Sequence, residues 1–328
     1  MALHAVDDLS DAYRATKSFL LPVEWGRWLR LALLSLFVAG SSGGGTPTSN
    51  FQAPFGTGTD PSPGTGPGMD QFGEFVGQEL FLIVGIAAVL FVIALVLQWF
   101  AAVFEFSFLE ALRTDEVHVR RYTSQFSGLG TRLFAFRLVF GLLTLLAVGG
   151  LALLIVGPML LGVGVAAPLL LGVLLVPIFI VLGIVAGVVY VFTTAFVAPI
   201  MLMEDRGVLS GWKRFWGVFK SAWQDFLVYV LVGLFLMIAI GIIVGIVMAI
   251  IGVAIALPVV VAFLVGGPLL GGLLAIPAVI VAVVVYGIVQ VPVQTYLRHW
   301  SLLVLGDVEP DLDLIPDRRE SVRGETTS

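Results

Sequence analysis

Long apolar segments alternate with short polar ones along most of this chain. No charged residue occurs from Leu138 to Met203 or from Phe226 to Leu297. A helix of a soluble protein keeps a polar face, whereas these segments are apolar on every face. Runs of 18 or more apolar residues are typical of membrane spans, because about 20 residues cross the hydrocarbon core. The pattern predicts an all-α, polytopic transmembrane helical bundle.

Six segments are candidate spans of a transmembrane domain over residues 25–304. They are residues 25–40, 80–104, 133–156, 170–203, 226–256 and 273–304. The first is short, since a helix over 25–40 is about 24 Å long and the hydrocarbon core is about 30 Å thick. Prolines at 177, 199, 277 and 292 are expected to kink their helices.

Basic residues separate the connections between these spans into two kinds. All 17 Lys and Arg residues lie at or beyond the same ends of the six segments, and the connections 41–79, 157–169 and 257–272 contain none. Because basic connections stay in the cytoplasm, six spans with both termini cytoplasmic account for the distribution. An amphipathic segment, 1–24, and a tail, 305–328, are then cytoplasmic. The Gly- and Pro-rich connection 41–79 is expected to be an external, disordered loop.

Residues 27–40 have a second interpretation. Positive charge, a ten-residue apolar run and small residues after it also resemble a cleavable signal peptide. The 24 residues before this helix are long and acidic for the start of such a leader. We favour a retained first span, which the repeat described next also requires.

Proline positions indicate an internal repeat. Aligning Gly157 with Leu257, 100 positions later, brings three prolines into register. The aligned pairs are Pro158 with Pro258, Pro168 with Pro268, and Pro177 with Pro277. Spans three and four and spans five and six are therefore expected to be copies of one unit. With a looser first copy, the chain forms three parallel helical hairpins, each entered through an interfacial amphipathic helix.

The three interfacial segments have apolar residues at helical spacing. These residues are Val6, Leu9, Tyr13 and Leu20 in the first, Val119, Tyr122, Phe126 and Leu129 in the second, and Trp212, Phe215, Trp216, Phe219 and Trp223 in the third. Aromatic and basic side chains lie at the headgroup level of a membrane. The expected interfacial anchors are Trp212, Trp216, Trp223, Lys213 and Arg214.

Few polar residues interrupt the spans. Those expected to line a polar path or to make interhelical contacts are Gln290, Gln294, Thr193, Thr194 and Gln98. Interhelical hydrogen bonds are the simpler interpretation, because they are routine in helical bundles. Glu105 and Glu110 are expected to be interfacial and to pair with Arg113. The pairs Gly183 with Gly187 and Gly241 with Gly245 have the spacing for close approach of helices.

Composition limits the chemistry of the chain. It has no cysteine, which excludes disulfides and thiol catalysis, and no His pair with the spacing of metal ligands. The net charge of −5 gives no indication of nucleic-acid binding. No catalytic, cofactor or metal site is therefore predicted.

Two segments resemble an uncharacterised family of haloarchaeal multi-pass membrane proteins. They are Phe196–Trp216 (FVAPIMLMEDRGVLSGWKRFW) and Val291–Pro316 (VPVQTYLRHWSLLVLGDVEPDLDLIP). The resemblance implies six spans in an archaeal cell membrane, and acidic loops with few lysines agree with a halophilic source. The layout is faintly similar to the membrane domain of some glycerophosphodiester phosphodiesterases. Because the chain lacks their catalytic domain, no activity or site residue carries over.

These observations favour a non-enzymatic protein of the cell membrane that acts in scaffolding, assembly or envelope organisation. Its expected partners are membrane lipids and proteins at the cytoplasmic face, without nucleic acid, metal or cofactor. The alternative is a transporter or channel for an uncharged or lipid-like solute, which the repeat and the proline kinks would support. An enzyme ranks third, because no acid–base or nucleophile constellation is visible.

Overall fold

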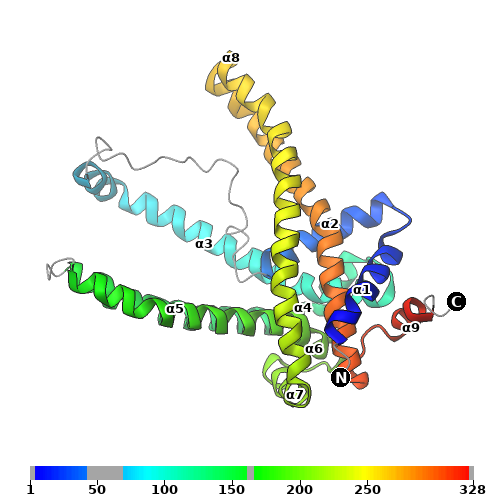
Figure 1. The fold of residues 1–328 in the computed structure, drawn as a ribbon. Helices are drawn as coiled ribbons and strands as arrows, with labels where there is room; N and C mark the ends of the chain where they lie inside the picture. Colours follow the sequence, from blue (N-terminus) through cyan, green and yellow to red (C-terminus); the bar gives the residue numbers. More distant parts are fainter. Residues whose placement is uncertain (1–3, 43–68, 161–165, 325–328) are drawn as a thin grey trace.

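The computed structural model describes residues 4–42, 69–160 and 166–324, and the regular structure in these residues is entirely helical (Figure 1). In chain order the elements are α1 (His4–Leu20), α2 (Trp25–Ser42), α3 (Met69–Thr114), α4 (Val119–Leu160), α5 (Ala166–Phe192), the π-helix η1 (Thr193–Val197), α6 (Ala198–Glu204), α7 (Val208–Ser221), α8 (Trp223–Val308), the 3-10 turn η2 (Pro310–Leu312) and α9 (Pro316–Gly324). The expectation of an all-helical protein is confirmed for these residues.

The long helices pack together at one end only. Buried apolar side chains gather where α1, α2, α6, α7 and α9 meet the inner ends of α3, α4, α5 and α8. We call this region the base (residues 4–39, 101–137, 188–236 and 287–324). From it α3 and α5 project to one side and α8 in another direction (Figure 1). Large apolar side chains along the projecting parts are exposed, as at Leu143, Leu174 and Leu264.

Among the described residues, four helices are long and apolar enough to cross a membrane. They cover Val84–Thr114, Val119–Pro158, Leu170–Glu204 and Trp223–Val308. A helix suits such sequences, because it satisfies every backbone N–H and C=O internally where lipid offers no hydrogen-bond partner. The first predicted span, 25–40, forms α2, which is not among the four.

The 86 residues of α8 form two limbs that run side by side (Figure 1). The helix is interrupted at Gly267, whose φ of 71° and ψ of −173° are accessible to glycine but not to residues with a side chain. The ring of Tyr229 on the first limb stacks on Trp300 of the second, with centroids 4.3 Å apart. The predicted spans 226–256 and 273–304 both lie in α8, one on each limb.

The helices extend further than the predicted loops allow. An external loop is predicted over 41–79, whereas α2 ends at Ser42 and α3 begins at Met69; residues 43–68 lie outside the described residues. The prediction of a disordered loop is therefore wrong for 69–79, which belong to α3. Likewise, the connection 257–272 is helical on both sides of the break at Gly267.

The N-terminal helix α1 lies along the second limb of α8. Trp300 Nε1 donates a hydrogen bond to the Ala5 carbonyl oxygen at 2.8 Å, and Thr16 Oγ1 lies 3.2 Å from His299 Nδ1. Small side chains at positions 5, 12 and 15 are fully buried and allow this close approach. Of the predicted apolar face, Leu20 is buried and Leu9 packs against the core, whereas Val6 and Tyr13 are exposed. The predicted face is therefore covered in part only.

Glycine permits close contact between helices at positions other than those predicted. A Cβ on Gly130 of α4 would lie 2.7 Å from the Val103 Cα atom of α3. A Cβ on Gly287 of α8 would lie 3.0 Å from the Ala32 carbonyl oxygen of α2. By contrast, nothing lies within 4 Å of a Cβ built at any glycine of the two predicted pairs at 183, 187, 241 and 245. The predicted close approach at those four positions is therefore wrong within this chain.

The C-terminal segment is folded against the base. The polar sequence of the tail 305–328 predicts a loose segment. In the structure, however, its apolar side chains are buried, namely Leu312, Leu314, Ile315 and Val322. Arg318 Nη1 of α9 donates to the Ala15 carbonyl oxygen of α1 at 3.3 Å. Apolar residues spaced among the acidic ones give the tail a buried side, which explains why it docks.

Candidate functional site

The base contains a buried ion cluster built from three helices. Glu105 of α3 has a carboxylate oxygen 3.3 Å from Arg137 Nη2 of α4, and its other oxygen pairs with Arg298 of α8. The three side chains are 0%, 2% and 5% exposed, respectively. Attraction between charges is strong in a water-poor interior, but the cost of desolvating them offsets much of it. Loss of one member would leave an uncompensated charge, so the three helices depend on one another.

The π-helix η1 adds a fourth partner to the ion cluster. Arg137 Nη2 donates to Thr194 Oγ1 at 3.0 Å, and Arg298 Nη1 donates to the Thr194 carbonyl oxygen at 2.5 Å. The Arg137 guanidinium also lies 5.2 Å from the centre of the Tyr190 ring, within the range of a cation–π contact. Thr194, one of the polar residues predicted within the spans, therefore lies between helices and touches both arginines.

The sequence after η1 explains why the Thr194 carbonyl is free to accept from Arg298. The Ala198 N–H donates to the Thr193 carbonyl oxygen, which is the π-helical pattern. The next residue, Pro199, has no N–H to give. Thr194 thus lacks a backbone donor, and a buried carbonyl without a partner is costly. The Arg298 side chain supplies the missing hydrogen bond.

The other predicted polar residues are distributed unevenly. Gln290 and Gln294 lie on the second limb of α8 and are buried. Gln98 lies on α3 and is partly exposed, seven residues before Glu105, or about 10 Å along the helix axis. Gln290 and Gln294 thus share the base with the ion cluster, whereas Gln98 lies further out.

Two of the predicted anchors face into the base. Trp212 of α7 donates through Nε1 to Thr193 Oγ1 at 3.1 Å. Arg214 pairs with Glu309 at 3.1 Å and lies 3.8 Å from Glu204. The two side chains connect α7 to η1, α6 and the end of α8, so their contacts are with protein.

The remaining predicted anchors are exposed. Trp216 and Trp223 are about half exposed, and Lys213 lies on the outer surface of α7. The ammonium group of Lys220 lies 5.8 Å from the centre of the Trp216 ring. Aromatic rings beside basic groups have the amphipathic character of residues that sit at a membrane surface.

Glu105 is the residue that sequence reasoning misplaced. Glu110 lies 3.7 Å from Arg113 as expected, but Glu105 is fully buried and pairs with Arg137 and Arg298 instead. Five residues apart, the two glutamates point about 140° apart around the helix, so only one can face solvent. The available sign was one arginine inside each of the spans 133–156 and 273–304, with Glu105 directly after span 80–104. A charge within a span is expensive unless it meets a partner.

A second network fixes the C-terminal tail. Arg323 of α9 donates to Asp307 of α8 at 2.6 Å, to Asp8 of α1 at 3.0 Å and to Asp11 at 3.1 Å. Burial and the charge of Asp307 together raise the pKa of the Asp8 carboxyl from 3.8 to about 7, although Arg323 acts in the opposite direction. One guanidinium therefore holds three carboxyl groups together, and α1, the end of α8 and α9 meet at this point.

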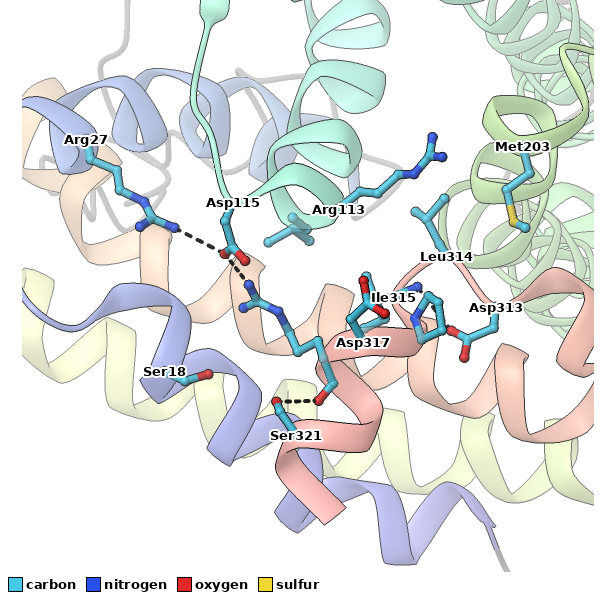
Figure 2. Close-up of a pocket in the computed structure, with 13 residues that line it drawn as sticks. Ser18, Arg27, Arg113, Asp115, Met203, Asp313, Leu314, Ile315, Asp317 and Ser321 are labelled. Carbon is cyan, nitrogen blue, oxygen red and sulfur yellow. Dashed lines mark hydrogen bonds and ion pairs between the residues drawn. The ribbon is translucent and has the colours of Figure 1, made fainter. Parts of the chain in front are cut away.

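A cavity of about 750 Å³ opens at the surface of the base (Figure 2). Its walls come from α1, α2, the turn after α3, the end of α6 and the tail. Arg27 and Arg318 both pair with Asp115 at one side of the cavity, and Figure 2 shows Arg27 pointing toward Asp115. Arg113, Asp313 and Asp317 also line the cavity, which is thus rich in charged groups of both signs.

These features define a helical protein with helices long and apolar enough to cross a membrane, joined at a base held by buried ion pairs. Residues 3–315 match a family model described as a family of unknown function, DUF7544. The chain belongs to that family, which agrees with the expected resemblance to an uncharacterised family. No curated protein and no solved structure matches the chain.

Proposed function

We propose that this protein is a non-enzymatic scaffold of the cell membrane, embedded through six spans and carrying its base on the cytoplasmic side. The observation that carries the proposal is the division of the molecule into a packed base and projecting apolar helices. Buried side chains concentrate in the base, while the projecting helices expose leucine, valine and isoleucine on their surfaces. Exposed apolar surface of this extent marks contact with lipid or protein.

The distribution of charge supports the orientation. The ion pairs of the base involve the same arginines that lie at or beyond one end of the predicted spans. Basic residues are retained on the cytoplasmic side of a membrane. The base and both chain ends would then face the cytoplasm, and Gly267, at the turn between the limbs of α8, would lie on the opposite side.

The fold is compatible with three repeated units. In the proposed units, α3, α5 with α6, and the second limb of α8 are the returning spans. The first two of these end at Asp115 and Asp205, both with left-handed backbone conformations (φ 59° and 47°). Aspartate tolerates this conformation better than most residues, and it ends a helix sharply. Matching helix ends in the first and second units support the looser first copy, whereas the prolines relate the second and third units.

The way in which the base is held supports the proposed scaffold role. The Glu105 cluster and the Arg323 network join helices from the start, the middle and the end of the chain. Rigid, charged surfaces suit binding to proteins at the membrane face, and Lys213, Trp216 and Trp223 lie exposed beside it. The proposed partners are membrane lipids and cytoplasmic proteins.

The alternative of a transporter or channel has less support. A solute path needs a cavity beside the buried polar residues. The cavity at the base and a second, apolar one of about 600 Å³ between the limbs of α8 are lined by other residues. Gln290, Gln294, Thr193 and Thr194 line neither cavity.

Reconstitution tests the two functions against each other. The purified full-length chain in liposomes is expected to leave the flux of glycerol, urea and fluorescent lipid at the level of protein-free vesicles. Chemical crosslinking in whole cells is expected to recover a partner in fixed stoichiometry, and Lys213→Glu is expected to reduce that yield. Saturable solute flux without any crosslinked partner would refute the scaffold and favour the transporter.

A further inference from the structure

We propose that the cavity at the base binds a phosphorylated polyol, either the headgroup of a phospholipid or a soluble phosphate ester. The inference goes beyond the scaffold role. It rests on the arrangement of Arg27, Arg318 and Asp115 in Figure 2.

Two guanidinium groups converge on a single carboxylate oxygen. Arg27 Nη2 lies 3.6 Å from Asp115 Oδ1, and Arg318 Nη2 pairs with the same atom. Arginines that converge on one anionic oxygen are well suited to a phosphate, which offers several oxygens in the geometry that guanidinium groups prefer. The pair carries one positive charge more than Asp115 neutralises.

The arginines are held in position before any ligand arrives. Both stack on Phe19, with guanidinium carbons 4.3 Å (Arg27) and 5.0 Å (Arg318) from the ring centre. Arg318 is fixed further by the bond to the Ala15 carbonyl oxygen. Arg27 Nε and Nη2 are buried and make no hydrogen bond to any described residue. Preorganised donors of this kind reduce the entropy lost on binding.

The Asp115 carboxylate has the properties of a group that a phosphate can displace from the two arginines. Its side chain is 59% exposed although it pairs with two arginines, and its backbone is in the left-handed region. Because the Asp115 carboxylate is on the solvent side of this pair, water can solvate it when a phosphate takes its place, and the two arginines keep an anionic partner. A phosphate that displaced the carboxylate would meet both guanidinium groups at once.

The opposite wall supplies acceptors for hydroxyl groups. Asp313 and Asp317 line the cavity beside α9. Asp313 is already neutralised by Arg319, at 3.2 Å, and accepts from the Ile315 backbone N–H at 3.0 Å. Carboxylates accept hydrogen bonds from hydroxyls but repel a second anion. A ligand with a phosphate at one end and hydroxyls at the other fits this distribution better than inorganic phosphate.

Binding to the purified full-length chain in a non-ionic detergent tests the proposal, independently of orientation in the membrane. The probes are glycerol 3-phosphate, dioctanoyl phosphatidylglycerol and dioctanoyl phosphatidylcholine, each measured by calorimetry and by the thermal shift it causes. Phosphatidylcholine is the zwitterionic comparison, since its headgroup keeps the phosphate but has no hydroxyl groups and carries a cation. Saturable binding of glycerol 3-phosphate would identify a soluble source, whereas binding of the phosphatidylglycerol alone would identify a lipid headgroup.

Three variants complete the experiment. Arg27→Gln is expected to weaken binding at least about tenfold, since it removes charge-assisted hydrogen bonds. Asp115→Asn is expected to strengthen binding several-fold, a gain that misfolding cannot produce. Arg120→Gln removes an exposed arginine outside the cavity and is expected to leave binding unchanged. Absence of saturable binding by glycerol 3-phosphate and phosphatidylglycerol, weaker binding in Asp115→Asn, or equal loss in Arg120→Gln would overturn the proposal.

Discussion

Arg298 Nη1 donates a hydrogen bond to the Thr194 carbonyl oxygen at 2.5 Å, although the two residues are 104 positions apart in the chain. The same arginine pairs with Glu105, so one side chain joins α8 to η1 and to α3. Pro199 leaves this carbonyl without a backbone donor, and the long-range bond compensates for it. A local break in one helix is thus stabilised by a charge from another.

Arg298→Lys is expected to destabilise the protein although the charge is kept. A lysine cannot serve the Glu105 carboxylate and the Thr194 carbonyl with two fixed donors, and the loss should be about 1–3 kcal/mol. Thermal unfolding in detergent measures the effect. In a Pro199→Ala background the backbone regains an N–H donor at position 199. The loss of stability caused by Arg298→Lys should therefore be smaller in that background. An equal penalty in both backgrounds would contradict the role given to Pro199.

Glu105→Gln is expected to cost about 3–5 kcal/mol of unfolding free energy, because it leaves two buried guanidinium groups without a countercharge. Glu110→Gln is the matched control on the same helix. Its side chain is 14% exposed and pairs at 3.7 Å with one arginine, whose side chain is 53% exposed, so its removal leaves no buried guanidinium group unpaired. The cost should therefore be smaller, about 1 kcal/mol. Chemical denaturation of the two variants provides the comparison. Similar costs would show that the Glu105 cluster does not hold the base together.

Gly130→Ala is expected to destabilise the contact between α3 and α4 by about 1–3 kcal/mol. The new methyl group would lie 2.7 Å from the Val103 Cα atom, and backbone cannot move aside as a flexible side chain can. Gly128→Ala has open space around it and should be neutral or stabilising, because alanine favours helix. Melting temperatures of both variants test this contact, and a harmless Gly130→Ala would disprove it.

Stability is expected to fall with rising pH through the titration of Asp8. The folded-state pKa of about 7 lies above the ordinary value of 3.8, so the protonated carboxyl contributes stability that is fully present below pH 3.8 and is lost as the pH rises through 7. Asp8→Asn should therefore gain in melting temperature over the parent protein between about pH 5 and about pH 8.5. Asp7→Asn, at an exposed position of the same helix, should not. A constant difference across this range would contradict the raised pKa.

The sequence predicts the helical class well, because long uncharged segments have few alternatives to helix. It also locates Gln294, Thr193 and Thr194, whose polar side chains stand out among apolar neighbours. Where the limbs of α8 turn is less evident, since the whole of 257–272 is rich in glycine and proline and only Gly267 leaves the helix.

The ion cluster could not be derived from periodicity. Glu105, Arg137 and Arg298 come from three separate helices, and their meeting depends on how these helices pack. The docking of the tail could not be predicted from the sequence for the same reason, because the partners of Arg323 lie on α1 and α8. The local sequence predicts which residues share a face of one helix. The partner of a buried charge depends on how separate helices pack, which the local sequence does not determine.

The central claim is that the chain crosses the membrane with its base in the cytoplasm and residues 41–79 outside. Because the chain has no cysteine, single cysteines can be introduced and labelled with a membrane-impermeant maleimide in intact cells. The account predicts labelling of Thr57→Cys from outside, and labelling of Ala2→Cys and Lys213→Cys only after the membrane is opened. Labelling of Lys213→Cys in intact cells, or protection of Thr57→Cys, would contradict it.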